Sequence, residues 1–193
     1  MSGNTPALVG ARVRLVPATP EDQRPIYEWL ACSDVTHAMI GPPLFPKHPV
    51  PTWEQFQEEY AGHFFDDSAP ELGRCFLIQV DGETAGQVSY NDLFEVAGGR
   101  RVELDIWLRS RAWCGKGIGP DALQTLCCYL EERFGVTECM VQPSARNPAA
   151  IRAYEKAGFS RIDLPADVLA AEWGPADYPD SVYLVRRKAT PNR

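Results

Sequence analysis

The sequence predicts one α/β domain over residues 1–193, with residues 1–10 as a loose N-terminal leader. A chain of 193 residues suits a single domain that buries most of its apolar surface. Hydrophobic residues make up 45% and charged residues 23%, as in ordinary globular proteins. No linker, repeat or low-complexity tract divides the chain. A strand–helix–strand–helix succession over 101–158 indicates the α/β class.

The first half of the chain supplies strands and two helices. Alternating charged and apolar residues predict a half-exposed strand over 12–16. Thr19, Pro20 and two acids begin a helix, and the five prolines of 41–51 predict an extended loop. A capping-box pattern at Thr52 begins a second helix that runs to about Phe65. The segments 75–80 and 83–91, separated by Asp81-Gly82, predict a hairpin.

The second half carries the α/β succession. A strand is predicted over 101–109, then an amphipathic helix over 120–134, a strand over 137–142 and a helix from Asn147 to Gly158. Final strands are expected at 159–162 and 182–185, joined by a Pro- and Ala-rich connection.

A glycine-rich loop links the strand at 101–109 to the helix at 120–134. Gly115, Gly117 and Gly119 stand at every second position, and glycine permits backbone conformations and close ligand contacts that other residues disfavour. Unpaired N–H groups and the positive end of the helix dipole suit a phosphate or pyrophosphate. We therefore expect a phosphorylated cofactor here; the alternative is a turn that binds nothing.

Two common phosphate-binding motifs fit this loop poorly. A P-loop requires Ser or Thr after its Gly-Lys pair, whereas Lys116 is followed by Gly117. Residues 117–122 match G-x-G-x-x-A, but a dinucleotide-binding fold needs an acid at the carboxyl end of the next strand. The chain has Val141-Gln142-Pro143 there.

A third interpretation is an acyl-coenzyme A site, and here the chain resembles the GNAT acyltransferases. The loop Gly115 to Gly119 is similar to that family's Q/R-x-x-G-x-G/A motif, although Cys114 occupies the Gln/Arg position. Residues 147–159 are similar to its N-x-x-A-x-x-x-Y-x-x-x-G-F motif. The two motifs occur in the family's order with a strand between them.

The resemblance implies a mixed, mostly antiparallel central sheet flanked by helices, whose β-α-β-α half binds acetyl-CoA. It implies an N-acetyltransferase that moves an acetyl group from acetyl-CoA to a primary amine, most similar in look to the aminoglycoside 6'-N-acetyltransferases. The residues expected to contact acetyl-CoA are Ile106, Trp107, Leu108, Trp113, Cys114, Gly115, Lys116, Gly117, Ile118, Gly119, Pro120, Asn147, Ala150 and Tyr154.

Two acids on the strand at 101–109 are candidate bases. Alternation places Val102, Leu104, Ile106 and Leu108 on a core face, and Glu103, Asp105 and Trp107 on the other. An ammonium must lose a proton before it attacks a thioester, and a carboxylate can take it directly or through water. Related aminoglycoside enzymes have an acid at the position aligned with Asp105, so Asp105 is the first choice and Glu103 the second. Either acid could instead pair with an arginine across the sheet.

Tyr154 is the expected acid, because its spacing from Asn147 matches the family motif and a phenol can protonate the departing thiolate. It could instead only pack against its helix. Asn147 is expected to cap that helix and to contact the pantetheine arm. Cys114 lies beside Lys116 and a helix N-terminus, where its pKa could be lowered. No His or acid at a recognisable spacing supports an acyl-cysteine route.

The composition indicates which classes of ligand the protein can bind. The formal charge of −7 disfavours a nucleic-acid surface and is compatible with a small cationic amine, for which Asp105, Trp107 and Gln142 are the expected contacts. An acid would suit an aminoglycoside better than Gln142. Scattered cysteines and separated histidines predict reduced thiols and no metal site.

No signal peptide or membrane-spanning pattern occurs, so we expect a cytoplasmic protein that acts away from membranes. A homodimer is compatible with the sequence. A protein N-terminal acetyltransferase of the ribosomal-protein type and a non-catalytic acyl-CoA sensor stay open as alternative functions.

Overall fold

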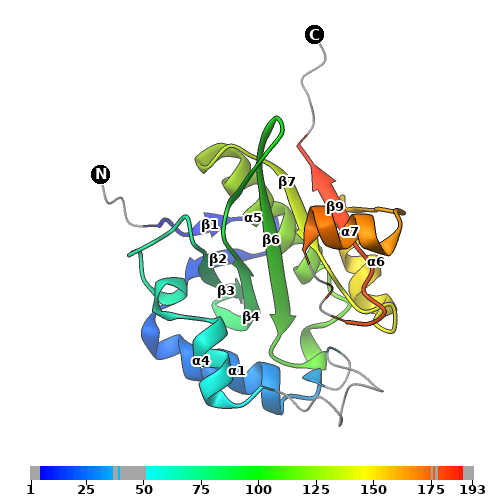
Figure 1. Cartoon of the computed structure of the whole chain (residues 1–193). Coiled ribbons are helices and arrows are strands. Elements are labelled where there is room, and N and C mark those ends of the chain that lie inside the picture. Colours follow the sequence, from blue (N-terminus) through cyan, green and yellow to red (C-terminus); the bar gives the residue numbers. More distant parts are fainter. Residues whose placement is uncertain (1–4, 37–38, 40–50, 175, 177, 189–193) are drawn as a thin grey trace.

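The longest strand of the molecule, β6 (Gly99–Leu108), runs through the middle of a mixed sheet (Figure 1). The computed structural model describes residues 5–36, 39, 51–174, 176 and 178–188. Its other strands are β1 (Leu8–Val9), β2 (Arg14–Pro17), β3 (Arg74–Val80), β4 (Glu83–Tyr90), β5 (Phe94–Val96), β7 (Val136–Val141), β8 (Ser160–Arg161) and β9 (Leu184–Arg187). Its helices are α1 (Gln23–Cys32), α4 (Trp53–Glu59), α5 (Ile118–Arg133), α6 (Pro148–Lys156) and α7 (Ala166–Trp173), with 3-10 turns η1 (Pro20–Asp22), η2 (Gly62–Phe65) and η3 (Arg111–Trp113).

The described strands form one sheet in the order β1-β2-β3-β4-β6-β7-β9-β8, and β5 also pairs with β6. Within this sheet β6 and β7 run parallel, while the remaining pairs are antiparallel. The mixed, mostly antiparallel sheet flanked by helices is therefore confirmed.

The parallel pair diverges halfway along β6. Its register ends at Glu103 opposite Met140, and β7 stops at Val141. On its other edge β6 stays paired with β4 as far as Leu108. One edge of residues 104–108 therefore has no strand partner among the described residues, and its backbone groups face a gap between the two strands.

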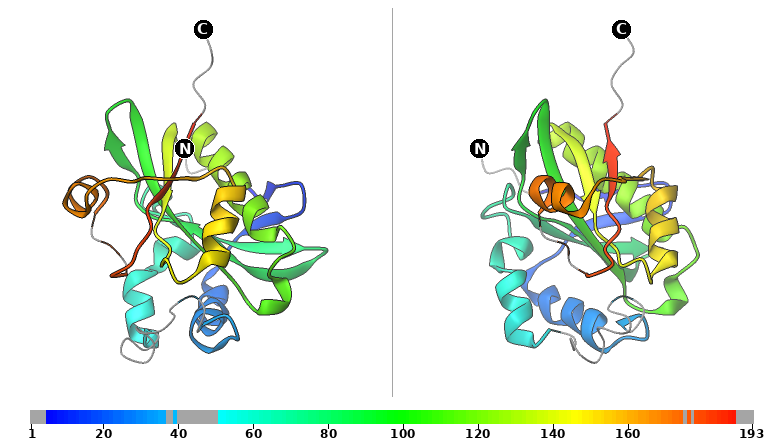
Figure 2. Two further views of the ribbon diagram at one scale, coloured as in Figure 1. Left: turned by 90° about the vertical axis from the view of Figure 1, so that its right-hand side faces the viewer. Right: turned by 45° about the vertical axis from the view of Figure 1, so that its right-hand side comes forward.

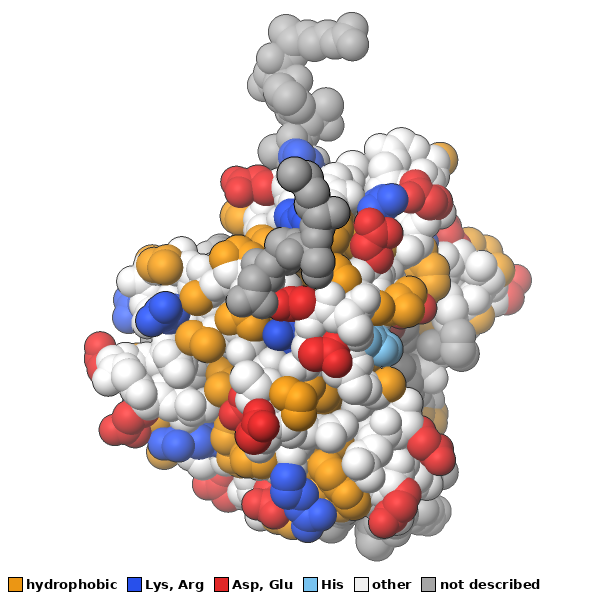
Figure 3. Space-filling view, turned by 90° about the vertical axis from the view of Figure 1, so that its left-hand side faces the viewer, with side chains coloured by type: hydrophobic (Ala, Val, Ile, Leu, Met, Phe, Trp, Pro, Cys, Tyr) orange, Lys and Arg blue, Asp and Glu red, His pale blue; other side chains and the backbone are white. Residues whose placement is uncertain are grey.

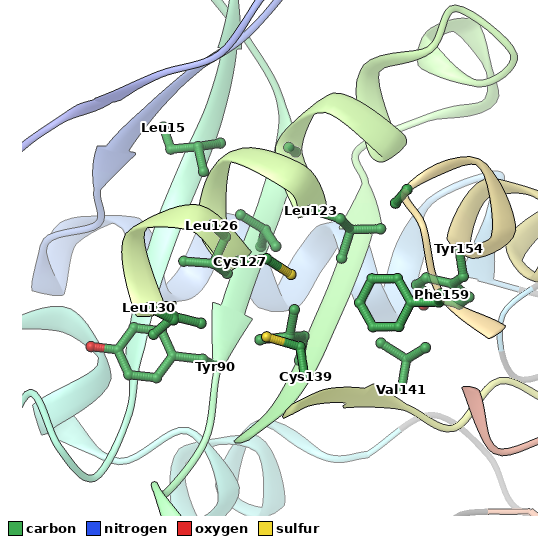
Figure 4. Close-up of a cluster of buried hydrophobic side chains, with 14 of the residues drawn as sticks. Leu15, Tyr90, Leu123, Leu126, Cys127, Leu130, Cys139, Val141, Tyr154 and Phe159 are labelled. Atoms are coloured by element: carbon green, nitrogen blue, oxygen red, sulfur yellow. The ribbon is translucent and has the colours of Figure 1, made fainter. Parts of the chain in front are cut away.

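One face of the sheet is covered by α5 and α6 (Figure 2). Leu123, Leu126 and Leu130 of α5 are completely buried and pack on the strands, as expected of an amphipathic helix. Figure 4 shows this core, in which Cys127 of α5 and Cys139 of β7 point toward one another. Both are free thiols, as the sequence predicted, and when buried they pack as small apolar side chains.

The opposite face is covered by α1, α4 and η2, which form a second core rich in aromatic side chains. Trp107 of β6 is 3% exposed and belongs to this core, packed at its edge against Tyr60. The sequence analysis assigned only the face with Val102 and Leu104 to a core. That view was incomplete, because strand alternation does not reveal which distant helices cover the second face.

The segment between β8 and β9 contains α7, where the sequence analysis expected only a connection. Trp173 at its end is buried together with Met140, Tyr183 and Val185 on the α1 side of the sheet. The guanidinium of Arg101 lies 3.5 Å from the centre of the Trp173 ring system. A run of helix-forming residues between Pro165 and Gly174 was the available signal.

Several predicted boundaries also differ. The leader expected at 1–10 is wrong from Thr5 onward, because Thr5 is buried against Asp67 and Leu8–Val9 pairs with β2. The helix expected to reach Phe65 ends at Glu59 and is followed by η2. The last strand begins two residues later than predicted, at Leu184. Residues 1–4 and most of the proline-rich loop, 41–50, lie outside the described residues.

Two surface observations complete the fold. On the face drawn in Figure 3, apolar, acidic and basic side chains alternate without a large patch of one kind. None of the helices in the described ranges combines the length and the apolarity that crossing a bilayer requires.

Candidate active site

Two adjoining cavities lie where β6 and β7 diverge. The larger, about 520 Å³, lies among the end of β6, the glycine loop, α5 and α6, and we call it the cofactor cavity. The smaller, about 370 Å³, lies among α1, α4, β6 and the segments 142–144 and 178, and we call it the acceptor cavity. Both are lined by Met39, Ile106, Trp107, Asn147, Ala150 and Tyr154. A molecule in one cavity can therefore meet a molecule in the other at this shared wall.

The glycine loop forms the mouth of the cofactor cavity. Gly115 and Gly117 have φ angles of +74° and +79°, which other residues rarely adopt, and a side chain added at Gly115 would meet no other atom within 4 Å. Gly117 is the N-cap of α5, and Gly119 lies in the first turn. The first N–H groups of a helix have no acceptor within it, so this end offers donors and a positive dipole to an anion.

Basic side chains line the same cavity, and no Asp or Glu does so among the described residues. Arg111 precedes the glycine loop, and Arg152 and Lys156 are one turn apart on α6. All but one of the residues expected at the cofactor line this cavity: Ile106, Trp107, Leu108, Trp113, Cys114, Gly115, Gly117, Ile118, Gly119, Pro120, Asn147, Ala150 and Tyr154. Lys116 belongs to the loop, but its exposed side chain is not part of the lining. Its size, donors and charge fit a long phosphorylated ligand.

The acceptor cavity has the opposite charge. Glu59, Glu103 and Asp105 line it, and the described lining includes no Lys or Arg. Gln142 and Trp107 also line it, as the sequence analysis expected of substrate contacts. Gln142 is 7% exposed, and its side-chain oxygen has no hydrogen-bond partner in the described part of the chain. A buried acceptor of this kind suits a donor group on a bound ligand.

Asp105 is held by two donors. Its Oδ2 accepts the Tyr60 hydroxyl at 2.7 Å, and its Oδ1 accepts the Ile106 N–H at 2.8 Å. It forms no ion pair with the described residues, so the cross-strand pair with an arginine is not observed for this acid. Burial raises the pKa of Asp105 above its ordinary value, and the two hydrogen bonds oppose that rise. Each carboxylate oxygen keeps a lone pair for a further donor.

Tyr154 and Asn147 come from α6. Asn147 is the N-cap, and its Oδ1 accepts the N–H of Ala150 at 3.1 Å, so the expected capping role is confirmed. Tyr154 is 8% exposed and packs against Phe159 (Figure 4). It also lines both cavities. The packing of Tyr154 against its neighbours is therefore compatible with a position at the active site.

Cys114 does not have the lowered pKa considered from the sequence. Burial and the nearby Asp34 raise the pKa of its thiol, and Arg111 only partly opposes them. Its Sγ lies 3.9 Å from the carbonyl oxygen of Ser110. A thiol kept protonated is a poor nucleophile, so the geometry gives no support to an acyl-cysteine route.

The sequence analysis missed several lining residues. Tyr60 and Glu59 are brought to the site by α4, and Arg152 and Lys156 were hidden within the second family motif. The last two could have been found, because positions four apart on a helix share a face. No local signal connects Tyr60 to Asp105.

Comparison with known proteins decides the family. A sequence profile of the acetyltransferase (GNAT) domain matches residues 12–160. The chain belongs to the GNAT acetyltransferase family. GNAT enzymes of this type use acetyl-CoA as the acyl donor, and the basic, glycine-lined cofactor cavity fits that donor. The chain is therefore an acetyl-CoA-dependent N-acetyltransferase.

Its relatives within the GNAT family include aminoglycoside enzymes. The chain is 30% identical over 151 residues to an aminoglycoside N(6')-acetyltransferase type 1 of Klebsiella pneumoniae, covering 74% of this chain and 71% of the relative. A structure of AAC(6')-Ib with ribostamycin and coenzyme A superimposes with a TM-score of 0.67 at 26% identity, over 92% and 94% of the two chains. RimL, a ribosomal L7/L12 α-N-protein acetyltransferase, shares the fold, with a TM-score of 0.65 at 18% identity over 96% and 98% of the chains.

Proposed function

We propose that this enzyme acetylates a primary amine of a small substrate with several positive charges, with an aminoglycoside as the first candidate. The observation that carries the proposal is the acceptor cavity, in which three carboxylates face a space without any described Lys or Arg. Such a lining favours cations over neutral or acidic ligands. The relative from Klebsiella pneumoniae and the AAC(6')-Ib structure support the aminoglycoside candidate.

The donor side would be held by the cofactor cavity. The N–H groups from Gly115 to Gly119 would bind the pyrophosphate. The exposed Lys116 of this loop would add positive charge. Acetyl-CoA supplies the acetyl thioester and a thiolate leaving group. Ile106, Leu108 and Asn147 line the cavity beyond the loop and would orient the arm that leads to the thioester.

Asp105 would act as the base. Its carboxylate lies on the acceptor side of the shared wall, where it would take a proton from the ammonium of the acceptor and leave a neutral amine to attack. Burial raises its pKa, which makes it a better proton acceptor than an ordinary aspartate. Glu103 is the second candidate, with a bridging water as a third route.

Tyr154 would act as the acid. It lines both cavities, so its hydroxyl can reach the leaving thiolate on one side while the acceptor occupies the other. Gln142 and Trp107 would contact the acceptor, and the unpartnered oxygen of Gln142 would accept a hydrogen bond from an amine or hydroxyl group. A cytoplasmic location and a homodimer stay predictions from the sequence.

A panel of amines tests the substrate class. Release of free thiol from acetyl-CoA is followed with kanamycin, ribostamycin, spermidine, lysine and a short peptide with a free N-terminus. We expect the highest kcat/KM for a compound with several ammonium groups, and a low value for the peptide. Efficient acetylation of the peptide together with no activity on any polyamine or aminoglycoside would refute the proposal and favour protein N-terminal acetylation.

A further inference from the structure

The phenol of Tyr60 connects a distant segment to Asp105. Its Oη donates to Oδ2 of Asp105 at 2.7 Å, although the two residues are 45 positions apart in the sequence. Tyr60 is 4% exposed, and it lines the acceptor cavity next to Asp105. A short bond between a buried phenol and a carboxylate is among the stronger hydrogen bonds in proteins. It restricts how the carboxylate can rotate.

Ring packing and a backbone hydrogen bond hold Tyr60 in place. It stacks on Phe56 of α4 with ring centres 4.7 Å apart, and it packs edge-on against Trp107 with centres 5.6 Å apart. The Tyr60 carbonyl oxygen accepts from Nε2 of Gln23 at 2.9 Å, which ties its backbone to the start of α1. The hydroxyl therefore points at Asp105 before any ligand arrives, as a preorganised site requires.

We propose that Tyr60 is a positioning residue for Asp105, whose hydroxyl holds the carboxylate with its remaining lone pairs turned into the acceptor cavity. The proposal rests on the proposed role of Asp105 as the base. Tyr60 itself is no alternative base, because burial and the neighbouring Asp105 raise the pKa of the phenol well above its ordinary value. It remains a donor at every pH at which the enzyme works.

The surroundings leave few other groups that could replace this donor. Besides Tyr60, the described titratable groups around Asp105 are Glu59 of α4, Glu103 of β6, Cys75 of β3, Tyr154 of α6 and Tyr178, and none of these is a cation. Arg74 is close enough to Cys75 to affect its thiol, but it donates to the carbonyls of Ala18 and Phe64. Without the Tyr60 hydroxyl, burial would raise the pKa of Asp105 further.

The test is the Tyr60→Phe variant in the full-length enzyme. We expect kcat/KM for the acceptor to fall about tenfold at pH 7, as loss of one hydrogen bond to a charged group implies. The acid limb of the pH profile should move to higher pH, while the Kd of acetyl-CoA stays unchanged. An independent readout is the NMR titration of the Asp105 carboxyl carbon, assigned with Asp105→Asn, which should also move to higher pH in Tyr60→Phe.

Tyr90→Phe is the matched control. The Tyr90 hydroxyl donates at 2.8 Å to the carbonyl of Pro70, and its completely buried ring lies in the core on the α5 side. This variant should lose a similar amount of thermal stability without any shift of the pH profile. If Tyr60→Phe leaves both the acid limb and the Asp105 titration in place, the positioning role is wrong, even if kcat falls. If Asp105→Asn keeps full activity, the proposed base is wrong, and the role of Tyr60 is wrong with it.

Discussion

The cofactor cavity and the acceptor cavity share a wall but carry opposite charge. Arg111, Arg152 and Lys156 line the first, whereas Glu59, Glu103 and Asp105 line the second. A phosphorylated donor and a cationic acceptor would each be attracted to one side and repelled from the other. The opposite charges of the two cavities show how a single gap in the sheet can bind two different substrates on its two sides and bring them together at Tyr154 and Ile106.

The two cavities also differ in how they are built. The mouth of the cofactor cavity is backbone from one continuous segment, the loop before α5. The acceptor cavity consists of side chains from α1, α4, β6 and segments after β7. Substitutions in the glycine loop should therefore alter acetyl-CoA binding by changing the backbone conformation. Substitutions in the acceptor cavity should alter catalysis or acceptor binding by removing single functional groups.

The largest expected effect is that of Asp105→Asn on the acceptor side. Loss of the base should lower kcat about 10²- to 10⁴-fold, the usual contribution of general base catalysis. Asparagine has nearly the same shape, so the Kd of acetyl-CoA should stay within about twofold of wild type. Thiol release and calorimetry measure the two quantities. If kcat and the affinity for acetyl-CoA fell by the same factor, the two cavities would not act as separate binding sites.

Tyr154→Phe should have the next largest effect. The hydroxyl is at the shared wall, so its loss should reduce kcat about 10- to 100-fold through slower protonation of the thiolate. The buried ring is retained, and the fold should be too. Tyr129→Phe serves as the control, because Tyr129 is partly buried against the core and lines neither cavity. Unchanged kcat in steady-state thiol release would show that Tyr154 only packs.

On the cofactor side, Gly115→Ala tests the backbone mechanism. Alanine at a φ of +74° costs about 1–2 kcal/mol, and the loop should relax away from its conformation. We expect the Kd of acetyl-CoA to rise about tenfold, which corresponds to about 1.4 kcal/mol. Gly82→Ala places the same strain, at a φ of +84°, in the hairpin between β3 and β4. It should lose similar stability with no change in Kd; a rise in both variants would point to general unfolding.

Removing one charge from either side should have a smaller effect, on acceptor binding in one case and on acetyl-CoA binding in the other. Glu59→Gln should raise the KM of an acceptor with several ammonium groups about threefold, and Lys116→Gln should raise the Kd of acetyl-CoA by a similar factor, because exposed charges contribute little. Neither variant should affect the other ligand. Both effects should shrink as salt is added. If Glu59→Gln instead raised the Kd of acetyl-CoA, the proposal that each cavity's charge acts on only one substrate would be wrong.

The contrast between the cavities also explains what the sequence could predict. The β6–α5–β7–α6 half is found within two residues of its predicted boundaries because glycines and the Asn147 cap mark it locally. Asp105 could be selected because it lies in the same stretch. The residues that complete the acceptor cavity could not, because Tyr60 and Glu59 meet β6 only after α4 packs on the sheet.

The second core shows the same limit. The pattern of β6 predicts two faces, but whether the face of Asp105 and Trp107 stays open depends on aromatic residues that are far away in the sequence, such as Phe56. Those residues bury Trp107 almost completely, although it still forms part of the acceptor-cavity wall together with Asp105. Local patterning indicates which side chains share a face, whereas tertiary packing decides which of them a substrate can reach.

The smallest expected effect concerns stability, and it links burial of the base to its function. Because the pKa of Asp105 is higher in the folded than in the unfolded chain, the folded state binds more protons between these two values, and stability falls as pH rises through that window. Asp105→Asn removes this dependence. Its free energy of unfolding relative to wild type should therefore increase from pH 4 toward pH 8, as expected when a site trades stability for activity.

Asp180→Asn provides a control of opposite sign. Arg146 binds the Asp180 carboxylate at 2.7 Å and lowers its pKa, so folding favours the charged form of this acid. Relative to wild type, this variant should lose stability as pH rises from acid values through the ordinary carboxyl range. Urea unfolding of the three proteins at several pH values separates the two trends. A flat difference for Asp105→Asn would mean that its carboxylate is not desolvated, and the acceptor cavity would then lack the strong base that its charge pattern suggests.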